Sequence, residues 1–570
     1  MTYSFNLVDE PWIPCLTFDG ERVEFGLRDT LVQAHKLREV RGDTPLETAS
    51  LHRLLLAVLH RVFGPKKPSI WKSLWGQERF DGSILEAYLH RPEIHHRFDL
   101  FDPENPFYQP CKRSENKPDD ETIKSHVQRK GKMSLTQFLD SSVRESVEPI
   151  SVISLLLHAA SGDNATLFDH NTKAVGISLT PAQAARALIT SQLFGFGGTS
   201  GVRENFSDAP GAKGILFFAR GRNLFETLML NMVRYDEDRP LPTPDANDLP
   251  AWEMEDPFVP DRRRPKGYLD YLTWHNRRIW LRPEKIEGRI VVRDMHWSPG
   301  LKLDADDADP MKHYFVDKKE GARPLCFTSG RALWRDSNVL FQLGGVNRPP
   351  KVVQWLARLA QPPVLVLDAA QWYQLMALGL AKSRASLDFL RSESLPLPID
   401  FLKHQDLVGE LGRALAVAES CATAIREASF VLAWLVLHPT ANAQVFETPA
   451  KINSKIKAGS RERSKDEEAK RIYKLSKSWD VERYYWSDLE VHFHRLIQDL
   501  PDAPEQTLQN WRDQVRRAAT AAFKQAERHA GNDNRTIRAA AVARQWFYVR
   551  LAATVGKASK TNSTKGGDKA

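Results

Sequence analysis

The chain has 570 residues, of which 42% are hydrophobic and 27% are charged. This length predicts roughly two to four domains with substantial cores, and the composition is ordinary for a soluble globular protein. The formal net charge of +8 permits a polyanionic partner but does not require one.

The cysteines and the chain start exclude several protein classes. Cys15, Cys111, Cys326 and Cys421 are far apart and form no CxxC pair, which argues against a zinc ribbon and against a disulfide framework. The first residues lack the basic and apolar regions of a signal peptide. No stretch approaches the roughly 20 apolar residues that cross a bilayer. We therefore expect a cytoplasmic protein without a membrane partner.

The N-terminal part predicts a hairpin followed by a helix. Residues 5–15 form a strand candidate interrupted by two prolines, and residues 21–26 can pair with it. Apolar residues then recur at helical spacing from about Pro45 to Leu59. Further along the chain, the apolar run at residues 150–160 predicts a buried helix.

A glycine-rich loop follows a well-marked helix. Thr180 is a good N-cap, Pro181 suits the first helical position, and Gly195 is predicted to end the helix in the left-handed conformation. From Gly195 to Arg203 bulky side chains are rare, which would let backbone N–H groups approach a phosphate or a base edge. A long helix cap with a turn is the alternative interpretation. A Walker or dinucleotide loop is excluded, because no GK[ST] follows and the loop comes after a helix.

The overall pattern predicts an α+β fold. Residues 268–345 alternate apolar and polar side chains in short runs, which indicates a β-rich region with irregular loops. We therefore predict a mixed, irregular N-terminal domain (residues 1–395) with helices and short β-sheets. Four successive amphipathic stretches then predict a C-terminal four-helix bundle (396–556) with one long connection after its first helix. The final residues 557–570, rich in Lys, Ser, Thr and Gly, should be a disordered tail.

Motifs of common enzymes are missing, because the sequence contains no HExxH, GxSxG or Walker pattern. His90, His95 and His96 form a cluster. Pro92 interrupts the helix that would align them, which favours a solvated turn over a metal site. The acidic run from Asp304 to Asp309 starts like a calcium loop, but it lacks the central glycine and the final glutamate, so we predict an acidic surface loop. We expect no metal, no cofactor and no catalytic residue.

Basic residues are concentrated between Lys451 and Lys477, where ten Lys and Arg face four acidic residues. The segment is either a solvated, mobile loop or a sequence-independent contact to a nucleic-acid backbone. The candidate contact residues are Lys451, Lys455, Lys457, Arg461 and Arg463. The runs Arg262–Arg264 and Arg277–Arg278 allow the same two interpretations.

Several short motifs occur in an order that resembles one family. They are Phe5–Pro14 (FNLVDEPWIP), Phe168–Asn171 (FDHN), Gly195–Gly198 with Gly201–Arg203, Gly267–Trp274 and Leu378–Ser386, followed by the helical bundle. The ordered set is similar to the large subunit of the type I-E CRISPR surveillance complex Cascade, the CasA family. The resemblance covers nearly the whole chain.

The resemblance implies a non-catalytic, DNA-binding subunit. In this family the subunit recognises the protospacer-adjacent motif (PAM) in double-stranded DNA through the minor groove, initiates unwinding and R-loop formation, and provides the docking platform for a helicase–nuclease. Sequence matching is left to guide-RNA pairing. The minor groove separates A·T from G·C but little more, so tolerance of several PAMs is expected. The implied partners are target DNA, guide RNA, the other Cascade subunits and the helicase–nuclease.

The resemblance also assigns roles to residues of this chain. The glycine loop that enters the minor groove corresponds to Gly195, Gly197 and Gly198. The loop that reaches the guide RNA and a neighbouring subunit corresponds to Phe168, Asp169, His170 and Asn171. The wedge that parts the first target pair corresponds to Lys382, Ser383, Arg384 and Ala385. Arg384 stands where the family's best-known wedge has glutamine, and an arginine could stack on an unpaired base or hold a phosphate.

Two further assignments have weaker support from the sequence. The family's basic minor-groove finger corresponds to Arg293, Lys302 or a nearby residue. The segment that begins at Lys451 would suit the displaced strand or the small subunits, by charge alone. Two alternatives from other classes remain. A metal-dependent nuclease would require His95, His96 and an acidic residue to converge, and a purely structural scaffold would require none of these sites.

Overall fold

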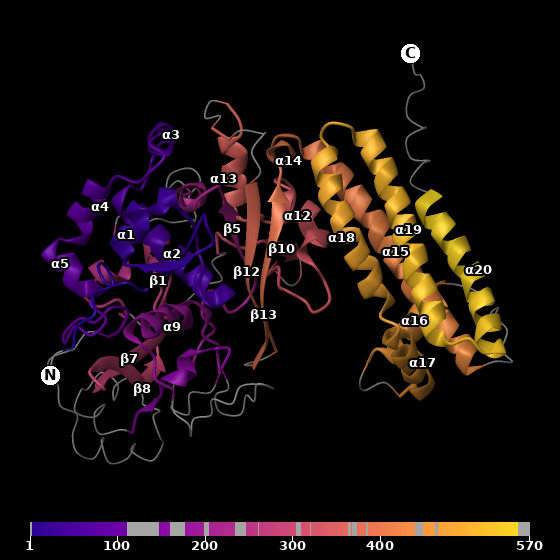
Figure 1. Cartoon of the computed structure of the whole chain (residues 1–570), viewed down its shortest axis with the longest axis horizontal. Helices are drawn as coiled ribbons and strands as arrows, with labels where there is room; N and C mark the ends of the chain where they lie inside the picture. Colours follow the sequence, from indigo (N-terminus) through magenta and orange to yellow (C-terminus); the bar gives the residue numbers. More distant parts are fainter. Residues whose placement is uncertain are drawn as a thin grey trace. The chain divides into compact units, whose positions relative to one another are not determined.

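A computed structural model gives the structure of the protein (Figure 1). It describes residues 3–110, 148–159, 177–198, 205–233, 247–259, 262–303, 309–317, 319, 321–362, 366–367, 373–383, 386–438, 449–461 and 465–556. The chain forms two compact units, Met1–Ser329 with Leu343–Lys403, and Gly330–Gln342 with His404–Ala570. The division at residues 403 and 404 lies eight residues beyond the predicted boundary, because α14 (Ile399–Lys403) belongs to the first unit. The predicted tail, residues 557–570, lies outside the described residues.

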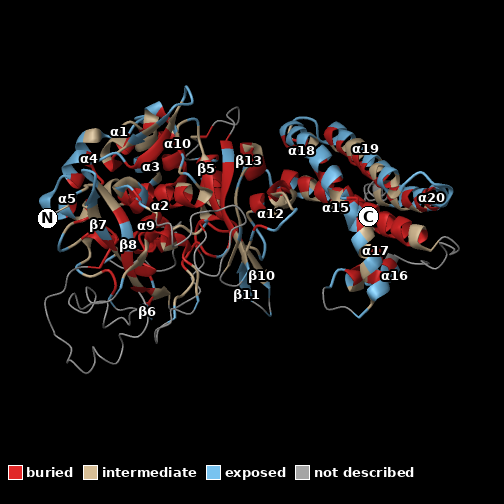
Figure 2. Ribbon diagram, turned by 60° about the horizontal axis from the view of Figure 1, so that its bottom comes forward, coloured by how far each residue is buried: buried red, intermediate tan, exposed pale blue. Residues whose placement is uncertain are grey.

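The N-terminal sheet has the order β2-β1-β3, with β1 (Ile13–Thr17) between β2 (Arg22–Phe25) and β3 (Leu37–Val40). The predicted hairpin therefore forms, although its first strand begins at Ile13. The predicted helix is α2 (Pro45–Val62), which is capped by Thr44 and buried along most of its length (Figure 2). The shorter helices here are α1 (Leu27–Val32), α3 (Pro68–Gly76), α4 (Gly82–Leu89) and α5 (Pro92–His95).

A second small sheet, of order β4-β8-β7, contains β4 (Ile150–Ser151), β8 (Arg289–Pro299) and β7 (Arg277–Ile286). The helix predicted at residues 150–160 is wrong. Ile150 pairs with Met295 of β8, and a 3-10 turn (Val152–Leu155) follows. Pairing with a distant strand thus overrides the local apolar pattern. Helix α9 (Pro181–Phe194) forms as predicted, with a capping box between Thr180 and Gln183.

The third sheet has the order β13-β12-β5, with β5 (Leu216–Arg220), β12 (Tyr373–Ser383) and β13 (Ser386–Leu397). Helix α10 (Leu224–Asn231) packs against β5. The remaining elements are α11 (Tyr268–Leu272), α13 (Lys351–Leu359), and the pairs β6 (Arg262–Arg263) with β9 (Lys302–Leu303) and β10 (Tyr314–Asp317) with β11 (Gly321–Pro324). These small separate sheets among helices confirm the predicted α+β class.

A buried charge cluster replaces part of the predicted acidic surface loop. Asp309 is 2% exposed and lies 3.2 Å from the Arg53 guanidinium of α2. The Tyr271 hydroxyl donates to the same carboxylate at 3.0 Å. The buried Lys312 ammonium donates to the Pro210 carbonyl at 2.5 Å. The expectation of a surface loop is therefore wrong for Asp309, because distant partners of opposite charge stabilise it inside.

The second unit contains the predicted four-helix bundle, formed by α15 (Gln405–Leu437), α18 (Val481–Asp499), α19 (Pro504–Ala530) and α20 (Asn534–Gly556). Helix α15 packs against the other three. By length and composition α15 could cross a membrane, which corrects the expectation that no segment is so apolar. However, 72% of its most apolar window is buried in the protein, as in the core helix of a bundle.

The long connection after α15 contains two helices, α16 (Pro449–Gly459) and α17 (Glu467–Ser478). They cross closely at Gly459, where a Cβ would lie 2.3 Å from the Ala469 carbonyl oxygen. The Asn453 amide of α16 donates to the Glu427 carboxylate of α15 at 2.6 Å. The basic segment is therefore largely a packed helical hairpin, and the mobile-loop interpretation is wrong for its described residues.

A short stretch that precedes the bundle in sequence, Gly330–Gln342, completes the second unit. Its helix α12 (Ser337–Phe341) packs on α15. Arg335 pairs with Glu419 at 2.7 Å and lies over the Trp486 ring, 3.7 Å from its centroid. The local sequence does not predict that Gly330–Gln342 packs with the bundle, because Glu419, the nearer partner of Arg335, is 84 residues away in the chain.

Candidate nucleic-acid interface

The glycine loop begins directly after α9, but not in the predicted conformation. Gly195 has φ −55° and ψ 135°, which is not left-handed, so that expectation is wrong. Glycine is required there for another reason. A Cβ on Gly195 would lie 2.8 Å from the Ser191 carbonyl oxygen and 3.1 Å from the Arg277 guanidinium. Glycine at position 195 is thus explained by the close approach of Ser191 and Arg277, and not by a positive φ angle.

The N–H groups at the start of the loop are already used within the protein. Gly197 donates to the Asp208 carboxylate at 2.7 Å. Gly198 donates to the Phe206 carbonyl at 3.1 Å and accepts from the Phe206 N–H at 3.0 Å. Residues 199–204 lie outside the described residues. The described part of the loop therefore offers backbone without side chains at Gly197 and Gly198, whereas the idea that its N–H groups point at a ligand is not supported at these two residues.

A buried arginine holds the loop from inside. The Arg277 guanidinium donates to the carbonyls of Phe196 at 2.6 Å and Ser207 at 3.0 Å, and lies over the Phe206 ring. Burial lowers the pKa of Arg277 to about 9, although the charge of Asp208 opposes the shift. Arg277 is 2% exposed, as is its neighbour Arg278. The basic pair is thus structural, and neither predicted interpretation, solvated loop or backbone contact, applies to it.

The two described residues of the predicted wedge, Lys382 and Ser383, lie at the end of the first strand of a long hairpin. β12 and β13 are paired from Tyr373↔Leu397 to Ser383↔Ser386 (Figure 1). The third strand, β5, reaches only as far as Leu378, so the last five residues of β12 extend about 16 Å beyond it. Ser383 is exposed and donates to Asp388 at 2.9 Å. Arg384 and Ala385 lie outside the described residues.

Asp208 connects the hairpin to the glycine loop. Lys382 has a side chain only 11% exposed, and its ammonium lies 2.5 Å from the carboxylate that also accepts from Gly197. The ammonium also lies over the Phe196 ring, at 5.2 Å. A β-bulge between Ala381 and Lys382 reorients the strand at this point. The predicted loop and wedge are therefore brought together, and Lys382 is a structural tie between them.

The carboxylate of Asp208 is ionised in this arrangement. Burial alone would raise its pKa, but hydrogen bonds from Lys213, Lys382 and the Gly197 N–H outweigh burial and lower the pKa to about 2. The Lys213 ammonium lies 2.8 Å away and is largely exposed. Asp208 thus makes one largely buried contact, to Lys382 of the hairpin, and one solvated contact, to Lys213 at the surface. Sequence analysis missed Asp208, since no motif surrounds it.

An open cavity of about 790 Å³ lies beside this tie. Its lining includes the charged residues Asp208, Lys213, Lys382 and Asp388 and the rings of Phe327 and Phe389. Aromatic rings next to ammonium groups are the combination that binds single-stranded nucleic acid through base stacking and phosphate contact.

The remaining predicted site residues are distributed over other elements. Arg293 on β8 is exposed and lies 3.7 Å from Glu284, and Lys302 on β9 is half-buried and in register with Arg262. On α16, Lys451, Lys455 and Lys457 are exposed, as is Arg461 just after it. Arg463 and the loop Phe168–Asn171 lie outside the described residues.

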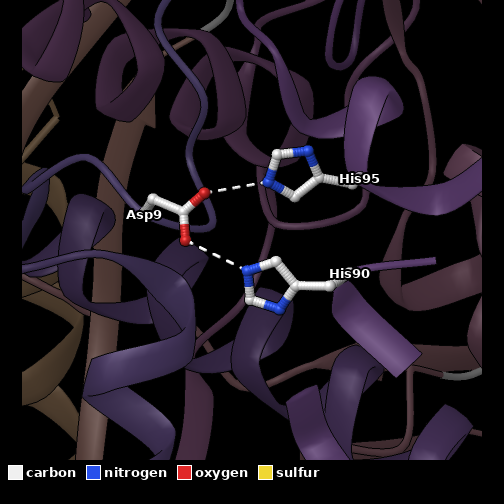
Figure 3. A group of neighbouring side chains, drawn as sticks. All are labelled: Asp9, His90 and His95. Atoms are coloured by element: carbon white, nitrogen blue, oxygen red, sulfur yellow. Dashed lines mark hydrogen bonds and ion pairs between the residues drawn. The ribbon is translucent and has the colours of Figure 1, made fainter. Parts of the chain in front are cut away.

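The histidine cluster is arranged differently from the nuclease hypothesis. His90 and His95 both face the carboxylate of Asp9 (Figure 3). The His96 ring instead hydrogen-bonds the Pro92 carbonyl. Burial opposes the shift, but hydrogen bonds from the two imidazoles lower the pKa of Asp9. The nuclease hypothesis required His95, His96 and an acidic residue to lie together. In the structure His95 and Asp9 do so, but the second histidine is His90 and not His96.

Comparisons with known proteins identify the family. The family model for CRISPR-associated protein Cse1 matches residues 6–522. The CRISPR-associated protein CasA/Cse1 of Thermus thermophilus is 32% identical over 573 residues, which cover 98% of this chain and 99% of that protein. A crystal structure of Thermus thermophilus CasA has a TM-score of 0.71 at 28% identity, covering 97% of this chain and 100% of that chain.

Two further solved structures share the fold. Cse1 of Acidimicrobium ferrooxidans has a TM-score of 0.75 at 24% identity, covering 98% of this chain and 99% of that one. A chain of a CRISPR RNA-guided surveillance complex has a TM-score of 0.67 at 20% identity, covering 96% and 99%. The resemblance inferred from the ordered motifs is confirmed, and the chain belongs to the CRISPR-associated protein Cse1 family.

Proposed function

We propose that the chain is the non-catalytic large subunit of a CRISPR RNA-guided surveillance complex of the Cascade type. Support comes from the match to Cse1 along nearly the whole chain and from the shared fold with a chain of such a complex. Its partners are then the guide RNA, the other subunits, target DNA and a helicase–nuclease, in the cytoplasm. Its role is to recognise the PAM, start strand separation and serve as the docking platform for the helicase–nuclease.

The observation that carries the proposal is the tie through Asp208. One carboxylate holds both Gly197 of the loop and Lys382 of the hairpin. A duplex that seats its minor groove on the loop would consequently meet a hairpin that is held to the loop at Lys382. The free energy of PAM binding can then drive separation of the adjacent base pair, as PAM-first recognition requires.

The loop would act through shape. Since the N–H groups of Gly197 and Gly198 are satisfied internally, the loop gains contact by letting the groove floor approach the backbone of these two glycines. Such a contact is sensitive to the width of the minor groove and to bulky groups on its floor, but to little else. This is consistent with tolerance of several PAMs. A basic finger, Arg293 or Lys302, would add charge from β8 or β9.

The strand-separating contact belongs to the exposed end of the hairpin. Lys382 is committed to Asp208, so the wedge reduces to Ser383, Arg384 and Ala385. The cavity beside the tie offers the rings of Phe327 and Phe389 to an unpaired base. The loop Phe168–Asn171 remains our proposed contact to guide RNA and the neighbouring subunit.

The basic helical hairpin α16–α17 would contact the displaced strand or the small subunits. Ile452 and Ile456 are buried, whereas Lys451, Lys455 and Lys457 are exposed. Each phosphate contact to a single strand contributes about 0.7 to the slope of log affinity against log salt. Changing the three lysines to glutamine should reduce that slope by about 1–2, because Lys455 is also paired with Asp466 at 2.9 Å. Changing the exposed Arg516, Arg517 and Lys524 of α19 to glutamine removes equal charge and serves as the control.

The decisive experiment measures duplex affinity of the assembled guide-RNA complex with and without this chain, at fixed salt, on targets with permuted PAM. Tight, PAM-dependent binding without cleavage supports the proposal, and Arg384→Ala should then slow R-loop formation more than it weakens binding. An equal rise for every duplex would leave only an electrostatic clamp or a scaffold. Cleavage by the purified chain that EDTA abolishes would favour the nuclease.

A further inference from the structure

A second site lies apart from the hairpin, where the N-terminal segment meets α4 and α5. His90 Nε2 lies 3.3 Å from one carboxylate oxygen of Asp9, and His95 Nε2 lies 2.8 Å from the other (Figure 3). The three potential ligand atoms lie within 4.8 Å of one another. Ligand atoms around a tetrahedral zinc ion are roughly 3.3 Å apart, because each bond is about 2.0–2.1 Å long. Small side-chain rotations would therefore suffice to enclose an ion.

The backbone around the three side chains is well anchored. Asp9 lies in a turn in which Asn6 accepts from the N–H groups of Val8 and Glu10, each at 2.9 Å. The flanking side chains of Val8 and Trp12 are fully buried. A metal ligand is most effective when its own support restricts its motion, and Asp9 meets this condition although its carboxylate is exposed.

The two histidines are held by the elements that carry them. His90 caps the end of α4, where its N–H donates to the Glu86 carbonyl at 3.0 Å. His95 is the last residue of α5, and the Asn6 amide donates to its carbonyl at 2.9 Å. The rings stack with centroids 5.2 Å apart, so both Nε2 atoms face the same carboxylate. Pro92, which was expected to disrupt alignment, instead starts the turn that brings His95 back toward His90.

We propose that Asp9, His90 and His95 form a binding site for a divalent transition metal, with Zn²⁺ as the ion that the site fits best. Two imidazoles and one carboxylate are a donor set suited to zinc and unsuited to Ca²⁺ or Mg²⁺, which prefer oxygen ligands throughout. The three side chains are between 33% and 48% exposed, which leaves room for water as a fourth ligand. A bound ion would link the N-terminal segment to α5, and this inference is independent of the proposed function.

The test uses the full chain after removal of metal with EDTA. Calorimetric titration with ZnCl₂ should give one site, and hydrogen exchange of residues 5–10 should slow when zinc is added. Substitution by His90→Ala or His95→Ala should weaken binding by at least roughly tenfold and abolish the protection. Asp9→Asn keeps a similar shape and should also weaken binding.

Two control variants show whether the site is specific. His96→Ala removes a neighbouring imidazole that faces the Pro92 carbonyl, and Cys326→Ser removes an exposed thiol. Both should bind zinc like the unaltered chain. The inference is overturned if the unaltered chain binds no zinc, or if His90→Ala and His95→Ala bind it as tightly as the controls do, because the cluster would then be an ion pair only.

Discussion

Removing the carboxylate of Asp208 should uncouple the glycine loop from the hairpin. In Asp208→Ala the Lys382 ammonium, 11% exposed, loses a charge-assisted hydrogen bond, which contributes about 1.5–3 kcal/mol. The Gly197 N–H loses its acceptor, at a cost of about 1–3 kcal/mol. The contact to Lys213 is 66% exposed and adds about 0–1 kcal/mol. Because such terms overlap, we expect a local loss of about 3 kcal/mol.

The assay is hydrogen exchange resolved by peptide, because a local loss changes the melting temperature of so large a unit by only a few degrees. A loss of about 3 kcal/mol raises the opening equilibrium roughly 100-fold, at about 1.4 kcal/mol per tenfold. Exchange should rise at Gly197 and Lys382 together. Asp388→Ala, which removes the acceptor of Ser383 on the same hairpin, should leave Gly197 protected. Unchanged exchange at Gly197 in Asp208→Ala would refute the tie.

Three further outcomes follow from the geometry. Gly195→Ala should lower the unfolding free energy by about 1–3 kcal/mol in denaturant melts, because its Cβ meets backbone at 2.8 Å, whereas Gly76→Ala, with open space around it, should not. Glu427→Ala removes the acceptor of the Asn453 amide and the partner of Arg550, whose side chain is 33% exposed, and should cost about 1–3 kcal/mol in the second unit. Because the pKa of Asp208 is lowered from 3.8 to about 2, its stabilisation is complete above pH 3.8 and is lost as the pH falls through about 2. Exchange at the loop, corrected for its intrinsic pH dependence, should hence be constant between about pH 5 and pH 8.

Local signals predicted much of the helical structure. Thr180 forms the predicted capping hydrogen bond at the start of α9, and Thr44 caps α2 in the same way. The helical spacing of apolar residues also located the four long helices of the bundle. Such signals act within a few residues of the chain and need no knowledge of the tertiary fold.

Interactions over long sequence distances were not accessible in the same way. Lys382 lies 174 residues from Asp208, and Arg277 lies 81 residues from the Phe196 carbonyl that it holds. Read locally, each is a basic residue suited to a phosphate. In the folded protein both side chains are largely buried and bind partners within the chain, so neither is available to a phosphate. Their burial and their partners are both determined by the tertiary fold. The same holds for Asp309, which reads as part of an acidic loop and is buried against Arg53.

This reversal changes where positive charge can act at the hairpin. Lys382 has a side chain only 11% exposed and is paired with Asp208 at 2.5 Å, so it is poorly placed to contact a phosphate. The net positive charge of this group is carried at the surface by Lys213, the second partner of Asp208. Of the four predicted wedge residues, Arg384 is the only other cationic one, and in the sequence it directly follows Ser383, the last paired residue of β12. A guanidinium can stack on a base and brings a permanent charge to a phosphate, whereas the amide of a glutamine is neutral. We therefore propose that Arg384 supplies to the target DNA the positive charge that Lys382 directs to Asp208.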